Sequence, residues 1–140
     1  MENIKDNLKK LAIGNALWYR KNAILLPNHN TMVGASIYTK QGFCYGGFNV
    51  QNKSHKSYHA EELAILHCQL YQVDSASVLG IVISFSDKDI TRLTFACGHC
   101  RQMLWEFTHN PDLLLTEVDL DGNIIEEKTL GELYPLPYPR

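Results

Sequence analysis

The sequence lacks any apolar run of the ~18 residues that a membrane-spanning helix needs. Its longest apolar stretch, VLGIVISF at residues 78–85, has the length of a β-strand. The first ten residues, MENIKDNLKK, lack the basic end followed by an apolar stretch that marks a secretory signal. These absences predict a cytoplasmic protein without a membrane partner. Thiols stay reduced in that compartment, so the four cysteines are expected to act as ligands, nucleophiles or packing groups.

An excess of basic residues is also missing. The chain has 13 Lys and Arg against 15 Asp and Glu, which gives a net charge of −2. No overall positive field is present to hold a polyanion, so a nucleic-acid partner is not expected. Internal repeats, low-complexity tracts and linkers are absent as well. With 140 residues, 45% hydrophobic and 20% charged, the chain is expected to form a single soluble domain over residues 1–140.

Hydrophobic periodicity predicts an alternation of helices and strands. Helices are expected at 4–21, at 58–71 and from about 98 to Asn110-Pro111, with a helical turn at 129–133. Strands are expected at 31–39, 43–48, 78–85, 113–119 and 123–128. The strand at 78–85 is apolar on both faces, and the helix at 58–71 is apolar around most of its circumference, so both are predicted to be buried. The order predicts an α/β fold with one sheet between helices, a three-layer α-β-α sandwich.

Two short segments combine residue types that bind zinc. They are His59-Ala60-Glu61 at the start of the second predicted helix and Cys97-Gly98-His99-Cys100 at the start of the third. One imidazole and two thiolates suit Zn²⁺, and three protein ligands leave the fourth tetrahedral position for water, as in catalytic sites. The free N–H groups and the positive dipole end at a helix start also stabilise thiolates.

Glu61 lies two residues beyond His59 and is interpreted as a proton carrier beside the metal. His-x-Glu followed by Cys-x-x-Cys is the signature of zinc-dependent nucleobase deaminases. Each part alone has a plainer interpretation. Cys97 and Cys100 could be a redox dithiol or two structural thiols, and Glu61 an ordinary acidic residue favoured by the helix dipole. His99 is interpreted as a spacer, because a fourth ligand would close the site.

At these residues the chain resembles the cytidine deaminase family. The matching motifs follow one another in the family's order over nearly the whole length: Val33-Gly34-Ala35, NVQN at 49–52, CGHCRQ at 97–102 with Leu104, and TLGEL at 129–133 with Pro135. The resemblance implies a mixed five-stranded sheet between helices. It also implies zinc bound by His59, Cys97 and Cys100, with Glu61 as the proton shuttle.

The resemblance implies further roles outside the zinc ligands. Asn49 would contact the ribose, and position 51 is a glutamate in the family that accepts a hydrogen bond from a sugar hydroxyl. Tyr138 occupies the place of an aromatic residue that reaches into a neighbouring subunit's site, and the family forms dimers or tetramers, so a homo-oligomer is implied. The plainer alternatives are that Asn49 and Gln51 are turn residues and that Tyr138 covers the core.

Four positions depart from the family pattern. Gln51 replaces the glutamate with a neutral acceptor, which forms a weaker hydrogen bond and predicts either a lower affinity for a ribose or an altered sugar preference. Thr31 stands where a phenylalanine often lines the pocket, and Ala96 where a proline usually precedes the first cysteine. Glu62 follows Glu61 where three-cysteine members carry arginine. One histidine and two thiolates balance the zinc charge, so that arginine is not needed.

The sequence therefore predicts a zinc-dependent hydrolase of pyrimidine salvage. It would deaminate cytidine or 2′-deoxycytidine to the uracil nucleoside and release ammonia. An altered pocket favours, as an alternative, a modified cytosine nucleoside such as blasticidin S, or a free base. Two hypotheses of other classes remain: a zinc-stabilised nucleoside-binding protein without turnover, and a dithiol redox protein.

Overall fold

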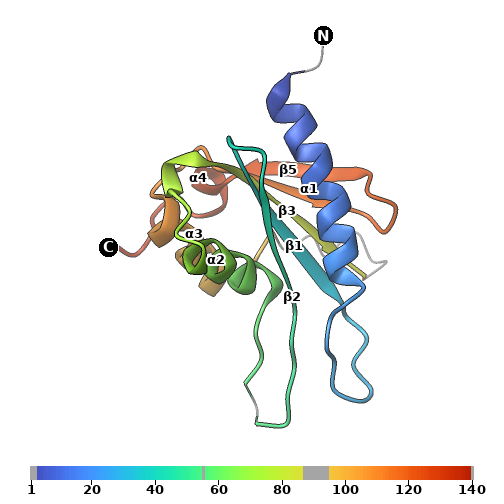
Figure 1. Ribbon diagram of the computed structural model, residues 1–140. Helices are drawn as coiled ribbons and strands as arrows, with labels where there is room; N and C mark the ends of the chain where they lie inside the picture. The colour runs from blue at the N-terminus through green and yellow to red at the C-terminus, as the bar shows by residue number, and fades with distance from the viewer. Residues whose placement is uncertain (1–2, 55, 87–94, 140) are drawn as a thin grey trace.

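The computed structural model describes residues 3–54, 56–86 and 95–139. The described elements, in chain order, are α1 (Ile4–Arg20), β1 (Val33–Thr39), β2 (Cys44–Phe48), α2 (Ala60–Leu70), the 3₁₀-helix η1 (Ser75–Ser77), β3 (Val78–Phe85), α3 (Gly98–Thr108), β4 (Leu114–Val118), β5 (Ile124–Thr129) and α4 (Leu130–Leu133) (Figure 1). Every helix and strand predicted from periodicity is present. The first strand begins two residues later than predicted.

The strands form one five-stranded sheet in the order β2-β1-β3-β4-β5. The β3–β4 pair is parallel, with Ile81 opposite Leu115, and the other pairs are antiparallel. The mixed five-stranded sheet is therefore confirmed. The single parallel pair arises because α3 carries the chain from β3 back across the sheet to β4, a crossover that parallel neighbours require.

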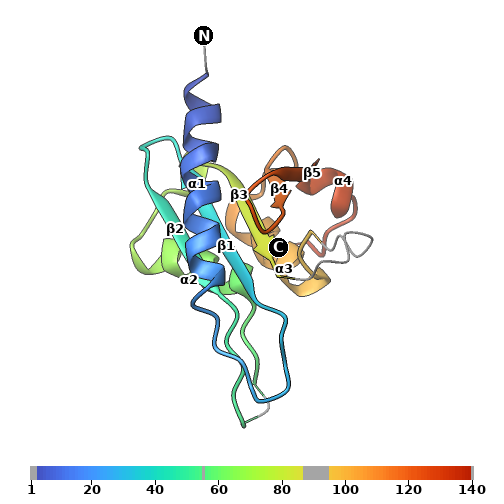
Figure 2. The ribbon, with the colours of Figure 1, turned by 90° about the vertical axis from the view of Figure 1, so that its right-hand side faces the viewer.

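Helices cover both faces of the sheet. Leu8, Ala12 and Ala16 of α1 pack in one cluster with Tyr38 and Val82. The other face is covered by α2, α3 and α4 (Figures 1 and 2). Because successive side chains of a strand point to opposite faces, β3 contributes to both layers, as its two-sided apolar pattern predicted. The three-layer α-β-α arrangement is confirmed.

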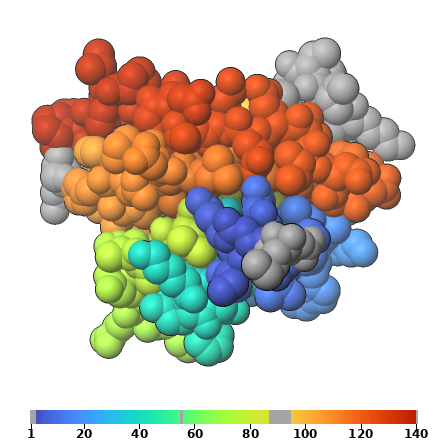
Figure 3. Space-filling model, turned by 90° about the horizontal axis from the view of Figure 1, so that it is seen from above, coloured from blue at the N-terminus to red at the C-terminus, as the bar shows by residue number. Residues whose placement is uncertain are grey.

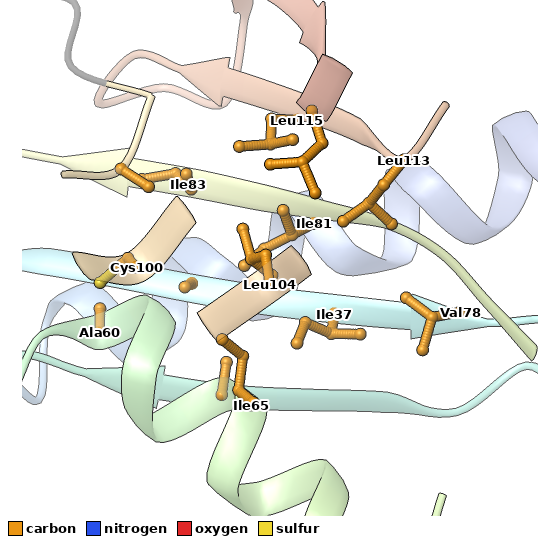
Figure 4. Close-up of a cluster of buried hydrophobic side chains, with 14 of the residues drawn as sticks. Ile37, Ala60, Ile65, Val78, Ile81, Ile83, Cys100, Leu104, Leu113 and Leu115 are labelled. Atoms are coloured by element: carbon orange, nitrogen blue, oxygen red, sulfur yellow. The ribbon is translucent and has the colours of Figure 1, made fainter. Parts of the chain in front are cut away.

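The larger core cluster lies between the sheet and the two helices α2 and α3. Figure 4 shows Leu104 of α3 gathered with Ile37 and Ile81 of the sheet, while Cys100 lies beside Ala60. All five side chains are at most 1% exposed. The same packed layer thus holds the first turns of both helices, from which the zinc-ligand candidates come.

Two glycines allow the helices to approach the sheet closely. A Cβ added at Gly34 would lie 2.2 Å from the backbone oxygen of Ala16 in α1. A Cβ added at Gly47 would lie 2.6 Å from the backbone oxygen of Ala60 in α2. No side chain fits between these backbones, so Gly34 and Gly47 set the distance of each helix layer from the sheet.

The exterior differs from the prediction at α2. Its side chains Leu66 and Leu70 are 43% and 79% exposed, so the prediction of a helix buried on all sides is wrong for the single chain. The sheet and α3 cover the inner side of this helix, and its outer side, with Leu66 and Leu70, is exposed in the described chain. No helix within residues 3–54, 56–86 and 95–139 has both the length and the apolar character to cross a membrane. Seen from above, the part of the chain from α3 to α4, coloured orange to red, lies along one side of the molecule (Figure 3).

We predict that Gly34→Ala destabilises the protein by about 1–3 kcal/mol, because the new methyl group overpacks the contact between β1 and α1. The midpoint of urea unfolding measures this effect. Gly14→Ala is the matched control, since Gly14 is exposed on α1 with no atom within 4 Å of an added Cβ. That control should stabilise the helix by roughly 0.5–1 kcal/mol. Equal midpoints for the two variants would contradict the close-approach argument.

Candidate metal centre

The starts of α2 and α3 bring the three zinc-ligand candidates together. His59 is the N-cap of α2 and Cys97 is the N-cap of α3, both with extended backbone. Cys100 follows in the first turn of α3. The Nδ1 atom of His59 lies 3.2 Å from the sulfur of Cys97 and 3.4 Å from the sulfur of Cys100. The three ligand atoms all lie within 4.8 Å of one another.

This arrangement fits zinc. Nitrogen and sulfur ligands of a tetrahedral zinc ion lie roughly 3.5–3.8 Å apart, since Zn–N and Zn–S bonds are about 2.1 and 2.3 Å long. The separations from His59 are close to that spacing. The set of one imidazole and two thiols is the one zinc prefers, and Zn²⁺ is the cofactor of this site. His99 is outside the group and is well exposed, which agrees with its interpretation as a spacer.

Glu61 lies in the first turn of α2, two residues after His59, but it is not part of the ligand group. It is only 5% exposed and lines the cavity beside the ligands. Burial raises the pKa of its carboxyl above the ordinary value, although a hydrogen bond with Cys100 and the charge of His59 act in the opposite direction. Burial also raises the pKa of the Cys100 thiol. A nearby divalent cation reverses that balance and favours the thiolate.

Glu62 supports the ligand geometry in a way that the sequence did not reveal. Its Oε1 accepts a hydrogen bond from the backbone nitrogen of His59 at 3.1 Å. Its Oε2 lies 3.2 Å from Nε2 of His99. One carboxylate therefore joins the start of α2 to the start of α3. The spacing of three residues from the N-cap to a glutamate was the signal that could have identified it.

A cavity of about 550 Å³ opens in front of the metal ligands. Its lining includes all of the predicted site residues of this region except Cys100: Asn49, Gln51, His59, Glu61 and Cys97. Thr31 lines it too, as expected for the position where the family often has phenylalanine. The structure thus joins the NVQN segment and the metal ligands in one cavity.

Tyr138 is not among the lining residues of this cavity and is 72% exposed. Its backbone is held in place by two contacts, from Gln102 Nε2 to its oxygen and from its nitrogen to the hydroxyl of Tyr134. Its role in a neighbouring subunit's site stays a prediction.

The amides of Asn49 and Gln51 are tied to the cavity wall. Asn49 accepts a hydrogen bond from the backbone nitrogen of Val33 at 2.8 Å and donates one to the oxygen of Thr31 at 2.9 Å. Gln51 accepts one through Oε1 from the backbone nitrogen of Leu26 at 3.0 Å. Both side chains are therefore held in the cavity wall by hydrogen bonds to the surrounding backbone.

The backbone before Cys97 takes an unusual path. Phe95 and Ala96 have positive φ angles of 43° and 71°. Proline fixes φ near −65°, so the family's proline does not fit this conformation, and alanine at 96 is consistent with it. A buried carboxylate, Glu117 of β4, accepts a hydrogen bond from the backbone nitrogen of Phe95. Nε of Arg101 donates one to the backbone oxygen of Phe95 at 3.4 Å.

Sequence analysis missed Glu117 as a residue that supports the site. It is fully buried on β4, which is otherwise made of Leu114, Leu115, Thr116 and Val118. An acidic residue in such a strand is the signal that could have found it, because a buried carboxylate needs a specific partner.

We predict that Cys100→Ala abolishes stoichiometric zinc binding, because only two ligands remain. Zinc content after gel filtration, measured by atomic absorption, checks this outcome. Cys44→Ala is the control, since Cys44 is a free cysteine of β2 outside the ligand group. Retention of one zinc per chain by Cys100→Ala would contradict the assignment.

We predict that Glu117→Leu weakens zinc binding about tenfold, by analogy with the loss of groups that orient metal ligands. The leucine removes the acceptor of the Phe95 N–H and so frees the segment that positions Cys97. Competition with a chromogenic chelator measures the affinity. Glu117→Gln keeps an acceptor oxygen and should bind zinc as the parent does. A leucine variant with unchanged affinity would show that Glu117 acts on stability alone.

Comparisons with known proteins agree with the geometry. Residues 8–112 match the family model described as the cytidine and deoxycytidylate deaminase zinc-binding region. The cytidine deaminase of Burkholderia pseudomallei superposes with a TM-score of 0.79 at 25% identity, covering 91% of this chain and 97% of that one. The Mycobacterium tuberculosis cytidine deaminase gives 0.71 at 24% identity, covering 94% and 98%. The Mycobacterium leprae enzyme gives 0.63 at 24%, covering 96% and 100%. The fold, the ligand cluster and the family match together show that this chain belongs to the cytidine and deoxycytidylate deaminase family of zinc-binding hydrolases.

Proposed function

We propose that the protein catalyses zinc-dependent hydrolytic deamination of cytidine and 2′-deoxycytidine to uridine and 2′-deoxyuridine, with release of ammonia. The observation that carries the proposal is the placement of Glu61, a buried carboxyl group on the cavity wall next to the ligand group. A purely structural metal site needs no such carboxyl. A proton carrier for hydrolysis needs this position, within reach of both water and substrate.

The cavity supports a cytosine ring as the reacting group. Val33, Ile83 and Phe85 supply apolar lining, which suits the faces of a flat heterocycle. The ligand residues and Glu61 line the same cavity and supply the polar groups. A ring held against the apolar wall would turn its amino-bearing edge towards Glu61.

In the proposed reaction His59, Cys97 and Cys100 hold the zinc ion. Bound there, zinc acts as a Lewis acid that makes water nucleophilic near neutral pH. Glu61 takes the proton of the attacking water and delivers it to N3 of the ring. It then carries a second proton to the amino group at C4, which leaves as ammonia. Burial keeps this carboxyl away from bulk water, so protons pass between it and the substrate.

The proposal extends to the biological setting predicted from the sequence. We propose a single-domain cytoplasmic enzyme of pyrimidine salvage that assembles as a homo-oligomer. Exposed apolar side chains at the end of α2 support assembly, because such a surface is stabilised by burial against another copy; they are Leu66, Leu70 and the C-cap Tyr71. Sedimentation equilibrium of the zinc-loaded protein measures the number of chains.

We predict that Glu61→Gln retains zinc and lowers ammonia release from cytidine by at least about a hundredfold, the contribution typical of a general acid–base group. Glutamine keeps the size of the side chain, but its amide neither takes up nor releases a proton near neutral pH. A coupled ammonia assay with cytidine and 2′-deoxycytidine measures the rates.

Glu126→Gln is the matched control, since Glu126 lies on β5 beside Lys128, away from the cavity. It should deaminate cytidine as the parent does. Normal turnover by Glu61→Gln would refute the assigned role. Tight nucleoside binding by the parent protein without ammonia release would favour the alternative of a zinc-stabilised binding protein.

A further inference from the structure

We propose that Glu62 and His99 form a positioning pair that holds the starts of α2 and α3 in the geometry needed to bind zinc. The inference rests on the zinc site that the proposed function uses, and it concerns two residues that do not themselves bind the metal. Both lie outside the ligand group, and neither lines the cavity. Sequence analysis gave His99 no role beyond that of a spacer between the two cysteines.

The two oxygens of the Glu62 carboxylate bond to the starts of two different helices. Oε1 accepts a hydrogen bond from the backbone nitrogen of His59 at 3.1 Å. Oε2 lies 3.2 Å from Nε2 of His99. A carboxylate only accepts hydrogen bonds, so Nε2 of His99 is the donor of this second bond. Glu62 and His99 are 37 residues apart in the sequence, so their bond fixes one helix start relative to the other.

None of these contacts uses an atom that binds the metal. The ligand atoms of the site are Nδ1 of His59 and the sulfurs of Cys97 and Cys100. The pair uses the backbone nitrogen of His59 and the ring of His99 instead. Zinc binding and the bond between Glu62 and His99 are therefore compatible, and both connect the same two helix starts.

The position of His99 suits it to this role. It lies in the first turn of α3 between the two cysteine ligands, so a shift of its backbone moves both sulfurs. Its ring stands perpendicular to the ring of His59, with the two ring centroids 6.5 Å apart. The Glu62 carboxylate thus restrains all three ligands, because it holds the backbone of His59 directly and the first turn of α3 through His99.

Exposure separates a positioning role from a contribution to overall stability. The side chain of His99 is 61% exposed and that of Glu62 is 18% exposed. Contacts with so exposed a partner contribute little to the free energy of unfolding. Groups that orient metal ligands, by contrast, typically change metal affinity by about 10- to 100-fold when they are removed. The pair is therefore expected to act on zinc affinity far more than on folding.

Three variants separate the parts of this arrangement. His99→Ala removes the bond between the helices and leaves the hydrogen bond from His59 to Glu62 intact. Glu62→Leu removes both bonds. Glu62→Gln is the conservative variant, because its amide oxygen can accept from His59 while its amide nitrogen donates to the ring of His99. His29→Ala is the matched control, since His29 is an exposed histidine outside the cavity and the ligand group.

Competition with a chromogenic chelator measures the zinc affinity, and the visible spectrum of the Co²⁺-loaded protein reports the ligand geometry. We expect His99→Ala and Glu62→Leu each to weaken zinc binding at least about tenfold and to alter the cobalt spectrum. The double variant should bind zinc as weakly as Glu62→Leu alone, because the two residues act through one contact. Glu62→Gln and His29→Ala should match the parent in both measurements.

His99 is exposed, so His99→Ala should fold as the parent does, and far-UV circular dichroism checks this. Parent-like zinc affinity and an unchanged cobalt spectrum in His99→Ala would overturn the inference. They would do so even if Glu62→Leu binds zinc weakly, because the lost hydrogen bond from His59 would then explain that loss. Equal losses of affinity in His99→Ala and His29→Ala would overturn it as well.

The proposed function is tested separately from the pair. A zinc-loaded parent that releases no ammonia from cytidine would refute the proposed function alone, and the zinc affinities of the variants would still decide the inference. A parent protein that binds no zinc would overturn both.

Discussion

The site depends on two helix starts being held side by side on one face of the sheet. The backbone contact at Gly47 sets the distance of α2, and Leu104 anchors α3 in the core. The N-terminal ends of α2 and α3 each carry a partial positive charge. Bringing these two ends together is unfavourable unless anions lie between them. Glu61 and Glu62 in the first turn of α2, and thiolates at the start of α3, supply that negative charge. A zinc ion held by His59, Cys97 and Cys100 would link the two helix starts through ligands from both.

Burial and charge act against each other at this junction. Cys100 is fully buried, and burial raises the pKa of its thiol because a thiolate is poorly solvated there. A divalent cation offsets that cost and converts the buried thiol into a ligand. Metal binding and the packing of α3 are therefore coupled, since the residue that binds zinc is also a core residue. Glu61 experiences the same burial without entering the ligand group, which leaves its carboxyl available for proton transfer.

The sequence predicted the elements and the ligand set because both are local patterns. A continuous apolar run identifies β3, and a Cys-x-x-Cys spacing at a helix start places two sulfurs on one turn. What it could not predict depends on contacts between distant segments. The positive φ of Ala96 follows from the path of the chain across Glu117, a residue 21 positions later in the sequence. The exposure of Leu66 follows from how far one sheet extends under α2, which no single helix pattern encodes.

The orientation of the amide side chains in the cavity wall could not be predicted from the sequence either. The sequence identified Asn49 and Gln51 as candidates for sugar contact, but residue identity does not say which end of an amide faces the substrate. Backbone N–H groups of Val33 and Leu26 each take an amide oxygen and so fix both orientations. A glutamate at 51 would be an acceptor on both sides, whereas glutamine can satisfy Leu26 and still donate. The orientation of each amide in this wall is thus decided by a backbone donor elsewhere in the chain.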